Sequence, residues 1–147
     1  MKKNLMLFAV AAGLTTTTFA QKEEKENKMK IDPPAAVKAV FAKQFPGSTA
    51  KWEEEQGNYE ANFKHKNHEM SALFTPAGTI EESEMEIKTN ELPAAVTTYI
   101  NKHHSGAKIK EAAKITKANG DIYYEAEIKG KDLIFDINGN FLKVAKN

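Results

Sequence analysis

Apolar and polar residues follow two different periods along this chain, and the same succession of periods occurs twice. An identical Pro-Ala-Ala-Val sequence stands at residues 34–37 and at residues 93–96, and each copy continues with helical spacing to Phe41 and to Ile100. Apolar side chains three to four residues apart form one stripe of a helix. Both predicted helices are short, so their stability must come from docking that stripe on another element.

After each predicted helix the period changes to two. In residues 59–63, Tyr59, Ala61 and Phe63 share one face of a strand, and residues 124–128 repeat the pattern. Clusters of glycine, asparagine and proline separate these runs and indicate hairpin turns. We therefore predict an α+β domain made of two tandem repeats. Each repeat is one helix followed by an antiparallel β-meander, and the helices pack on one face of the sheet.

The ends of the chain differ from this domain. A basic start, a short apolar run from Leu5 to Leu14 and a small-residue site ending at Ala20 predict a signal peptide over residues 1–20. Residues 21–31 are charged and poor in apolar side chains, which predicts a disordered leader. The domain then covers residues 32–147, with repeat one at 32–89 and repeat two at 90–147. We expect a periplasmic or secreted protein.

Composition narrows the function classes. The chain has 21 basic residues, all of them lysine, and 20 acidic residues; the signal peptide carries two of the lysines, which leaves 19 basic residues. A nearly neutral domain without arginine is not expected to bind nucleic acid, because such sites depend on arginine and on a basic patch. The absence of cysteine excludes disulfides, thiol catalysis and cysteine-based zinc sites.

Several motifs together resemble one family. Phe45-Pro46-Gly47 at the end of the first helix, Trp52, the Tyr-Glu strands and the Asp-x-Asn-Gly turn at residues 136–139 resemble the PepSY-like, β-lactamase-inhibitor-like exported domains of Bacteroidetes, over roughly residues 32–145. The resemblance implies a non-enzymatic binding or inhibitory module of the cell envelope, with no particular target. The second copy departs by having Glu111 where the first has Trp52.

The predicted contact surface is the sheet face turned away from the helices. If Phe74 points toward the helices, Leu73 must point away, and the same holds for Ile134 in the second copy. Tyr123 falls on this face, and Trp52 is the fourth candidate. Apolar residues ringed by charge are typical of interfaces, although single exposed apolar residues are also ordinary. We expect an envelope or secreted protein as the partner, bound by a monomer.

The acidic residues allow two interpretations. Glu82, Glu84 and Glu86 alternate along one predicted strand and are expected on a solvated face, or on an acidic surface for a cationic partner. Carboxylates in a hydrolase need a pocket that drives their pKa values apart. No nucleophile accompanies these glutamates, so we predict no catalytic residues and no enzyme.

A calcium-responsive protein is the alternative. Asp132, Asp136 and Asn138 could offer oxygen ligands, but an EF-hand loop counted from Asp136 would need a glutamate at Asn147. A hairpin turn with Gly139 at positive φ is the preferred interpretation. No metal site and no cofactor are predicted. The four histidines lack the converging partners of a zinc site and are expected at the surface.

Overall fold

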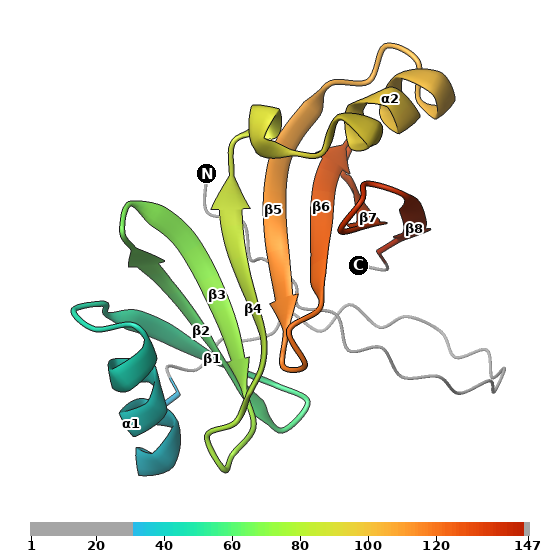
Figure 1. The fold of residues 1–147 in the computed structure, drawn as a ribbon. Coiled ribbons are helices and arrows are strands. Elements are labelled where there is room, and N and C mark those ends of the chain that lie inside the picture. Colours follow the sequence, from blue (N-terminus) through green and yellow to red (C-terminus); the bar gives the residue numbers. More distant parts are fainter. Residues whose placement is uncertain (1–30, 146–147) are drawn as a thin grey trace, which may run out of the picture.

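The computed structural model describes residues 31–145. The predicted signal peptide, the first ten residues of the predicted leader and the last two residues of the chain lie outside this range. The described chain is an α+β fold with two α-helices and one eight-stranded antiparallel sheet, whose strands lie side by side in chain order (Figure 1). The predicted fold class is confirmed at this level.

Each half of the described chain contains a helix followed by four strands. The first half consists of α1 (Ala35–Gln44), β1 (Ala50–Glu55), β2 (Asn58–His65), β3 (His68–Phe74) and β4 (Ile80–Ile87). The second half consists of α2 (Ala94–His103), β5 (Ile109–Lys117), β6 (Ile122–Ile128), β7 (Lys131–Asp136) and β8 (Phe141–Val144), preceded by the 3₁₀ turn η1 (Thr89–Glu91). Pairing of β4 with β5 joins the halves into one sheet.

Strand register places both helices on the same face of the sheet. Directly paired residues of antiparallel strands point to the same side. The pairs of Ala61 with Ala72, of Ala72 with Ser83 and of Ser83 with Thr116 carry one face from β2 to β5. On this face α1 packs against β2 and β3, and α2 packs against β6 and β7. We call it the helix-covered face.

The two helices bury different side chains. In the first half the core is aromatic: the Phe41 ring lies 5.0 Å from that of Phe63 and 5.3 Å from that of Trp52, both edge to face. In the second half Val96 and Ile100 pack with Leu133 and Phe135 among mainly aliphatic neighbours. The core under α2 also takes in Ile87 and Met85 of β4, so this strand contributes to both halves. Each short helix depends on such apolar contact to stay folded.

Two hairpin turns lie against the first turns of the helices. Gly78 follows β3 with φ of +90°, and Gly139 follows β7 with φ of +83°. A Cβ at Gly78 would lie 3.0 Å from the carbonyl oxygen of Ala36 in α1, and one at Gly139 would lie 3.0 Å from the Cβ of Ala95 in α2. Glycine is required at both turns because the backbone is left-handed and touches the first turn of a helix.

The start of α1 differs from its prediction. Asp32, the expected N-cap, makes no capping hydrogen bond; the helix begins at Ala35 after Pro34, and the Asp32 carboxylate pairs with Lys38. Two prolines separate Asp32 from the first helical residue, so its side chain cannot reach the first free N–H groups.

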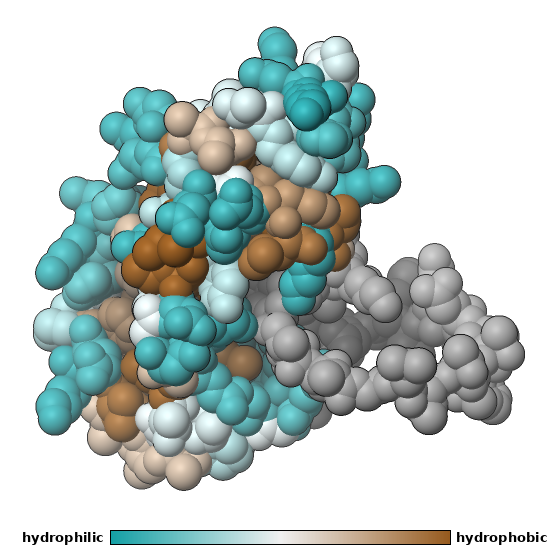
Figure 2. All heavy atoms as spheres, turned by 45° about the vertical axis from the view of Figure 1, so that its right-hand side comes forward, coloured by the Kyte–Doolittle hydropathy of each residue, from teal (hydrophilic) through white to brown (hydrophobic). Residues whose placement is uncertain are grey.

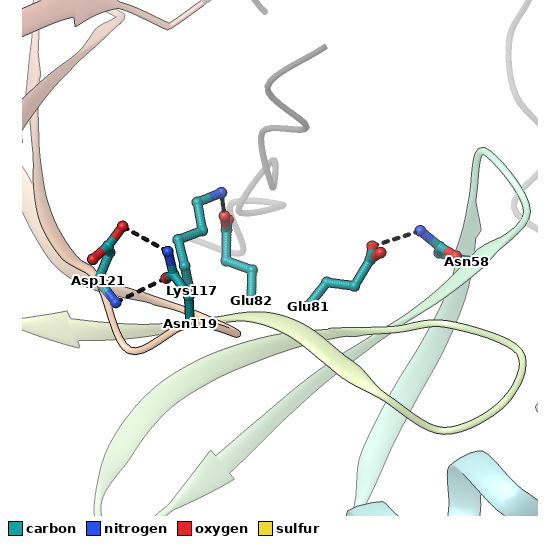
Figure 3. Close-up of polar contacts among 6 residues, drawn as sticks. All are labelled: Asn58, Glu81, Glu82, Lys117, Asn119 and Asp121. Atoms are coloured by element: carbon teal, nitrogen blue, oxygen red, sulfur yellow. Dashed lines mark hydrogen bonds and ion pairs between the residues drawn. The ribbon is translucent and has the colours of Figure 1, made fainter.

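Polar contacts surround the start of β4, and those made by Lys117 and Ala118 join the two halves. Asn58 Nδ2 donates to Glu81 Oε2 over 2.8 Å, and the Ala118 N–H donates to the Glu81 carbonyl over 2.8 Å. Figure 3 shows Asn58 and Glu81 pointing toward one another, beside the ion pair of Lys117 with Glu82.

Candidate partner-binding face

The opposite side of the sheet has no helix over it within residues 31–145, and we call it the helix-free face. Three rows of side chains, defined by register, cross the middle of it. The middle row reads Lys51, Asn62, Ser71, Glu84, Ile115, Tyr123 and Asp136. The two flanking rows contain Glu53, Glu60, Leu73, Glu82 and Lys117, and Glu86, Ala113, Glu125, Ile134 and Lys143.

Leu73, Tyr123 and Ile134 lie on the helix-free face, as their alternation predicts. Their exposure is not that of a surface patch, because Leu73 is only 7% exposed and Ile134 only 5% exposed. Tyr123 is half-buried. Leu73 and Ile134 therefore contribute to packing, and only Tyr123 offers appreciable surface to a partner.

The structure brings two of these residues together. Tyr123 and Ile134 pack with Ile115 and Ala145 in a small apolar cluster on the helix-free face. Ala145 is held there by its N–H, which donates to the Asp132 carbonyl over 2.7 Å. Leu73 lies outside this cluster, in register with Glu60 and Glu82. Sequence analysis missed Ile115, whose partner across the strands could not be known from local alternation.

Trp52 is on the wrong side for the predicted surface. It pairs with Ala61 on the helix-covered face, and its ring lies 5.7 Å from that of Phe74. The indole thus completes the aromatic core under α1. The prediction that Trp52 joins the contact surface is wrong because pairing with β2 turns its side chain toward the helix.

The acidic run on β4 is less exposed than predicted. Glu86 is exposed, but Glu82 and Glu84 are buried. Glu82 forms an ion pair with Lys117 of β5, and in β6 the buried Glu127 lies 3.8 Å from the Lys110 ammonium. Burial lowers the pKa of Lys117, and the nearby Lys143 lowers it further. A solvated strand is therefore the wrong description for Glu82 and Glu84.

Among residues 31–145, no lysine is paired with Glu84 as Lys117 is with Glu82. Glu84 is 1% exposed, and its Oε1 atom has no hydrogen-bond partner among the described residues. Burial raises the pKa of Glu84 well above its ordinary value of 4.5, and the carboxylates of Glu125, Glu60 and Asp132 raise it further. Directly opposite on β3, the Ser71 hydroxyl is also fully buried and without a partner in residues 31–145.

The alternative calcium ligands do not converge. Asp136 Oδ1 accepts the N–H groups of Asn138 and Asn140, each over 2.9 Å, and its Oδ2 accepts the Asn140 side-chain amide. These hydrogen bonds lower the pKa of Asp136. Asp132 stands four residues earlier in the same strand, about 13 Å away at the usual rise per residue. The segment is the predicted hairpin turn.

The four histidines lie in two separate places, His65 opposite His68 in the β2–β3 hairpin and His103 beside His104 at the end of α2. His65 Nδ1 lies 2.9 Å from the Ser48 hydroxyl at the β2–β3 hairpin, and the His103 ring stacks on Tyr99 at 4.4 Å. Across residues 31–145, no three histidine or acidic side chains come together in a way that could hold a metal ion. No helix in the same range is long and apolar enough to cross a membrane.

Further exposed apolar residues lie at the β8 edge of the sheet. Ile137 in the β7–β8 turn is 55% exposed, and Leu142 and Val144 of β8 are also exposed. Figure 2 shows apolar groups on this side of the molecule separated by hydrophilic ones. Val144 pairs with Leu133 on the helix-covered side, so this edge is distinct from the helix-free face.

No family model matches the chain, and no curated protein matches it closely. Solved structures do share its fold. A candidate periplasmic protein of Bacteroides eggerthii superposes with a TM-score of 0.71 at 16% identity, over 78% of this chain and 88% of that one. A DUF2874 family protein of Bacteroides uniformis gives 0.69 at 16% identity, over 76% and 88%.

A BLIP-like protein of Bacteroides fragilis superposes with a TM-score of 0.62 at 22% identity, over 78% of this chain and 86% of that one. At these identities the likeness concerns the fold. The β-lactamase-inhibitor-like part of the predicted resemblance is therefore supported at the level of architecture, and its PepSY-like part stays a prediction.

Proposed function

We propose that this protein is an exported, non-enzymatic binding module that docks an envelope protein on its helix-free face. The observation that carries the proposal is the apolar cluster of Ile115, Tyr123 and Ile134, which lies on the face opposite both helices. Each member is paired in register with a carboxylate residue, namely Glu84, Asp136 and Glu125 in that order. Ile115 and Ile134 are buried within this cluster, and the half-buried Tyr123 is the member that offers surface to a partner. An apolar centre with a charged surround is the usual anatomy of a protein interface.

The finer parts of the proposal rest on the sequence. The chain acts in the periplasm or outside the cell as a monomer, after removal of residues 1–20. Its halves descend from one duplicated PepSY-like unit, and inhibition of an envelope enzyme is one form that binding would take. The fold shared with a BLIP-like protein supports this class of function.

A pull-down tests the proposal. The full chain is expressed with a C-terminal tag, purified from the envelope fraction and used to capture partners from envelope extract. We expect one stoichiometric partner, bound about tenfold more weakly by Tyr123→Ala because the half-buried ring is the accessible part of the cluster. The matched control is Ile137→Ala, which removes an exposed apolar side chain from a turn outside the face. Equal losses in both variants would refute the helix-free face as the docking surface.

The calcium-responsive alternative is tested with the same material. The capture is run with calcium and with a chelator, and thermal unfolding is followed at millimolar calcium. A partner seen only with calcium, together with a raised midpoint, would favour the alternative; an unchanged midpoint would remove it.

A further inference from the structure

Exposed apolar side chains gather at one edge of the sheet, along β8. Leu142 and Val144 of β8 are 49% and 43% exposed, and Ile137, in the turn before β8, is 55% exposed. These three are the exposed large apolar side chains of residues 31–145. Single exposed apolar residues are ordinary, but their gathering beside one strand indicates a contact surface.

The opposite edge of the sheet has different chemistry. β1 and β8 are the end strands of the sheet, so each pairs on one side only within residues 31–145 (Figure 1). β1 contains Lys51, Glu53, Glu54 and Glu55, and charged side chains on an edge strand discourage pairing with a further strand. β8 contains one charged residue, Lys143. The β8 edge therefore has less of the charge that protects β1.

The backbone of β8 directs hydrogen-bonding groups toward this edge. The Ala145 N–H donates to the Asp132 carbonyl over 2.7 Å, which makes these two residues a hydrogen-bonded pair. Hydrogen-bonded and non-hydrogen-bonded pairs alternate along an antiparallel ladder. Val144, which pairs with Leu133, therefore points its N–H and carbonyl away from β7. An added strand is the ligand that such edge groups recognise.

The apolar cluster of the helix-free face continues to the same edge. Ile115, Tyr123 and Ile134 lie on β5, β6 and β7, and Ala145 directly follows β8, so the cluster crosses the sheet strand by strand. Lys143 of β8 is paired with Ile134 on this face. A partner that covers Tyr123 is two strands, or about 10 Å, from the β8 strand.

Register sets the side-chain pattern of an added strand, because paired residues of neighbouring strands point to the same side. The residue opposite Lys143 would lie on the helix-free face. Burial lowers the pKa of Lys117 and the charge of Lys143 lowers it further, so two ammonium groups repel each other there and a carboxylate would be attracted. The residue opposite Val144 would lie on the helix-covered side, where an apolar side chain would cover the exposed Val144.

We propose that the β8 edge accepts an extended segment of the partner protein as an added strand, with an acidic residue opposite Lys143 and an apolar residue opposite Val144. This inference rests on the proposed function and gives the same partner a second contact beside the helix-free face. Main-chain hydrogen bonds supply the affinity of an added strand, and alternate side chains supply its specificity. A second copy of this chain is disfavoured as the occupant, because pairing of two β8 strands brings positive charges together.

The first experiment uses a defined peptide and needs no cellular partner. The full chain is purified and freed of its tag, and acetyl-Thr-Val-Glu-Val-Thr-amide is titrated into it while amide proton exchange is followed by NMR. We expect exchange of the Val144 amide proton to slow at least about tenfold at saturation, because that group becomes hydrogen-bonded. The amide protons of β1 should exchange equally with and without the peptide. Equal protection of both edges would overturn the proposal.

Two control peptides separate the parts of the recognition. Acetyl-Thr-Val-Lys-Val-Thr-amide places a second ammonium beside Lys143 and should bind at least about threefold more weakly. Acetyl-Thr-Pro-Glu-Pro-Thr-amide lacks two backbone N–H groups and should not protect the Val144 amide proton. Tighter binding of the lysine peptide, or protection by the proline peptide, would overturn the proposal.

Matched variants localise the binding. Val144→Asp should weaken the glutamate peptide at least about fivefold, and Val144→Thr, which keeps the branched shape, should weaken it less. Ile137→Asp places the same charge at an exposed apolar position outside the strand, so it should change affinity by less than about twofold. Equal effects of Val144→Asp and Ile137→Asp would show general charge repulsion and contradict strand addition.

The free protein tests the other occupants of the edge. Without peptide, the Val144 amide proton should exchange rapidly at every protein concentration. Protection that grows with protein concentration would assign the edge to a second copy. Protection that is independent of concentration would assign it to another segment of this chain. Either result would overturn the proposal.

The pull-down separates this inference from the proposed function. A captured partner that both Tyr123→Ala and Val144→Asp release, and that Ile137→Asp retains, supports both. A partner that Tyr123→Ala releases and Val144→Asp retains overturns the added strand and leaves the binding module standing. Capture of no partner refutes the binding module, and the peptide titration alone then decides whether the β8 edge accepts a strand.

Discussion

The two faces of the sheet use the same strands and opposite side chains, yet they bury different chemistry. The helix-covered face buries Phe74 and Phe135 beneath helices, and each ring meets other aromatic groups. The helix-free face buries Ser71 and Glu84, which find no hydrogen-bond partner in residues 31–145. The apolar burial on the first face is explained by stability, because removing apolar surface from water lowers the free energy of the folded state. Burying Ser71 and Glu84 in this way costs stability, whereas the apolar cluster of Ile115, Tyr123 and Ile134 on the same face contributes to it.

The largest expected effects test the helix-covered face. Phe74→Ala and Phe135→Ala should each lower the free energy of unfolding by about 3–5 kcal/mol, because a ring is removed from a closed core. Urea denaturation followed by circular dichroism measures the change. Ile137→Ala, at an exposed turn position, should stay within about 0.5 kcal/mol of the parent protein. Small losses at both phenylalanines would mean that the helices do not close this face.

The apolar cluster on the other face comes next. Ile134→Ala should cost about 2–3 kcal/mol, because the side chain is buried against Ile115. Tyr123→Ala should cost less, since the ring is half-buried. Unfolding curves of the two single variants make the comparison. An unchanged midpoint for Ile134→Ala would restore the exposed patch that sequence alternation predicts.

A smaller loss of stability is expected at the hairpin turn that contacts α2. Gly139→Ala should lower stability by about 1–3 kcal/mol, because the residue is left-handed and its new Cβ would press on α2. Gly120→Ala has a similar φ of +88° and no atom within 4 Å of the new Cβ, so it isolates the cost of backbone strain. The midpoint of thermal unfolding should be lower for Gly139→Ala than for Gly120→Ala. The reverse order would show that contact with the helix is unimportant.

The smallest expected effect is a gain in stability instead of a loss. Folding raises the pKa of Glu84, so the folded protein holds its proton more tightly than the unfolded chain. The stability from this group is fully present below the ordinary pKa of 4.5 and is lost as pH rises through the raised pKa. Glu84→Gln should therefore stabilise the protein at neutral pH by on the order of 1 kcal/mol.

The same substitution should flatten the loss of stability above pH 4.5. Unfolding free energies are measured across the pH range for Glu84→Gln, with Glu86→Gln as the exposed control. A destabilised Glu84→Gln at neutral pH would show that the carboxylate is satisfied in the free protein. That result would remove the contrast between the faces.

The two halves show where prediction from sequence succeeds and fails. Repeated apolar spacing predicts both helices, and alternation predicts that Leu73 and Ile134 point away from Phe74 and Phe135. The alignment of the two copies predicts that Glu111 occupies the position equivalent to Trp52. Register instead puts Ala112 across from Ala126, as Trp52 is across from Ala61. A bulge between Ile109 and Glu111 shifts the count by one residue, and no local pattern announces it.

The sequence by itself determined the order of elements, the glycine turns and the side of each strand on which neighbouring residues fall, because dihedral preferences and alternation are local properties. Only the tertiary structure decided which strand lies in the middle of the sheet and which residues meet across it. Those pairings turned Trp52 toward α1, buried Glu84 and placed Ser71 beside it. Burial depends on contacts between segments far apart in the chain. A run of alternating glutamates has the same sequence pattern whether its strand lies in the middle of a sheet or at an exposed edge.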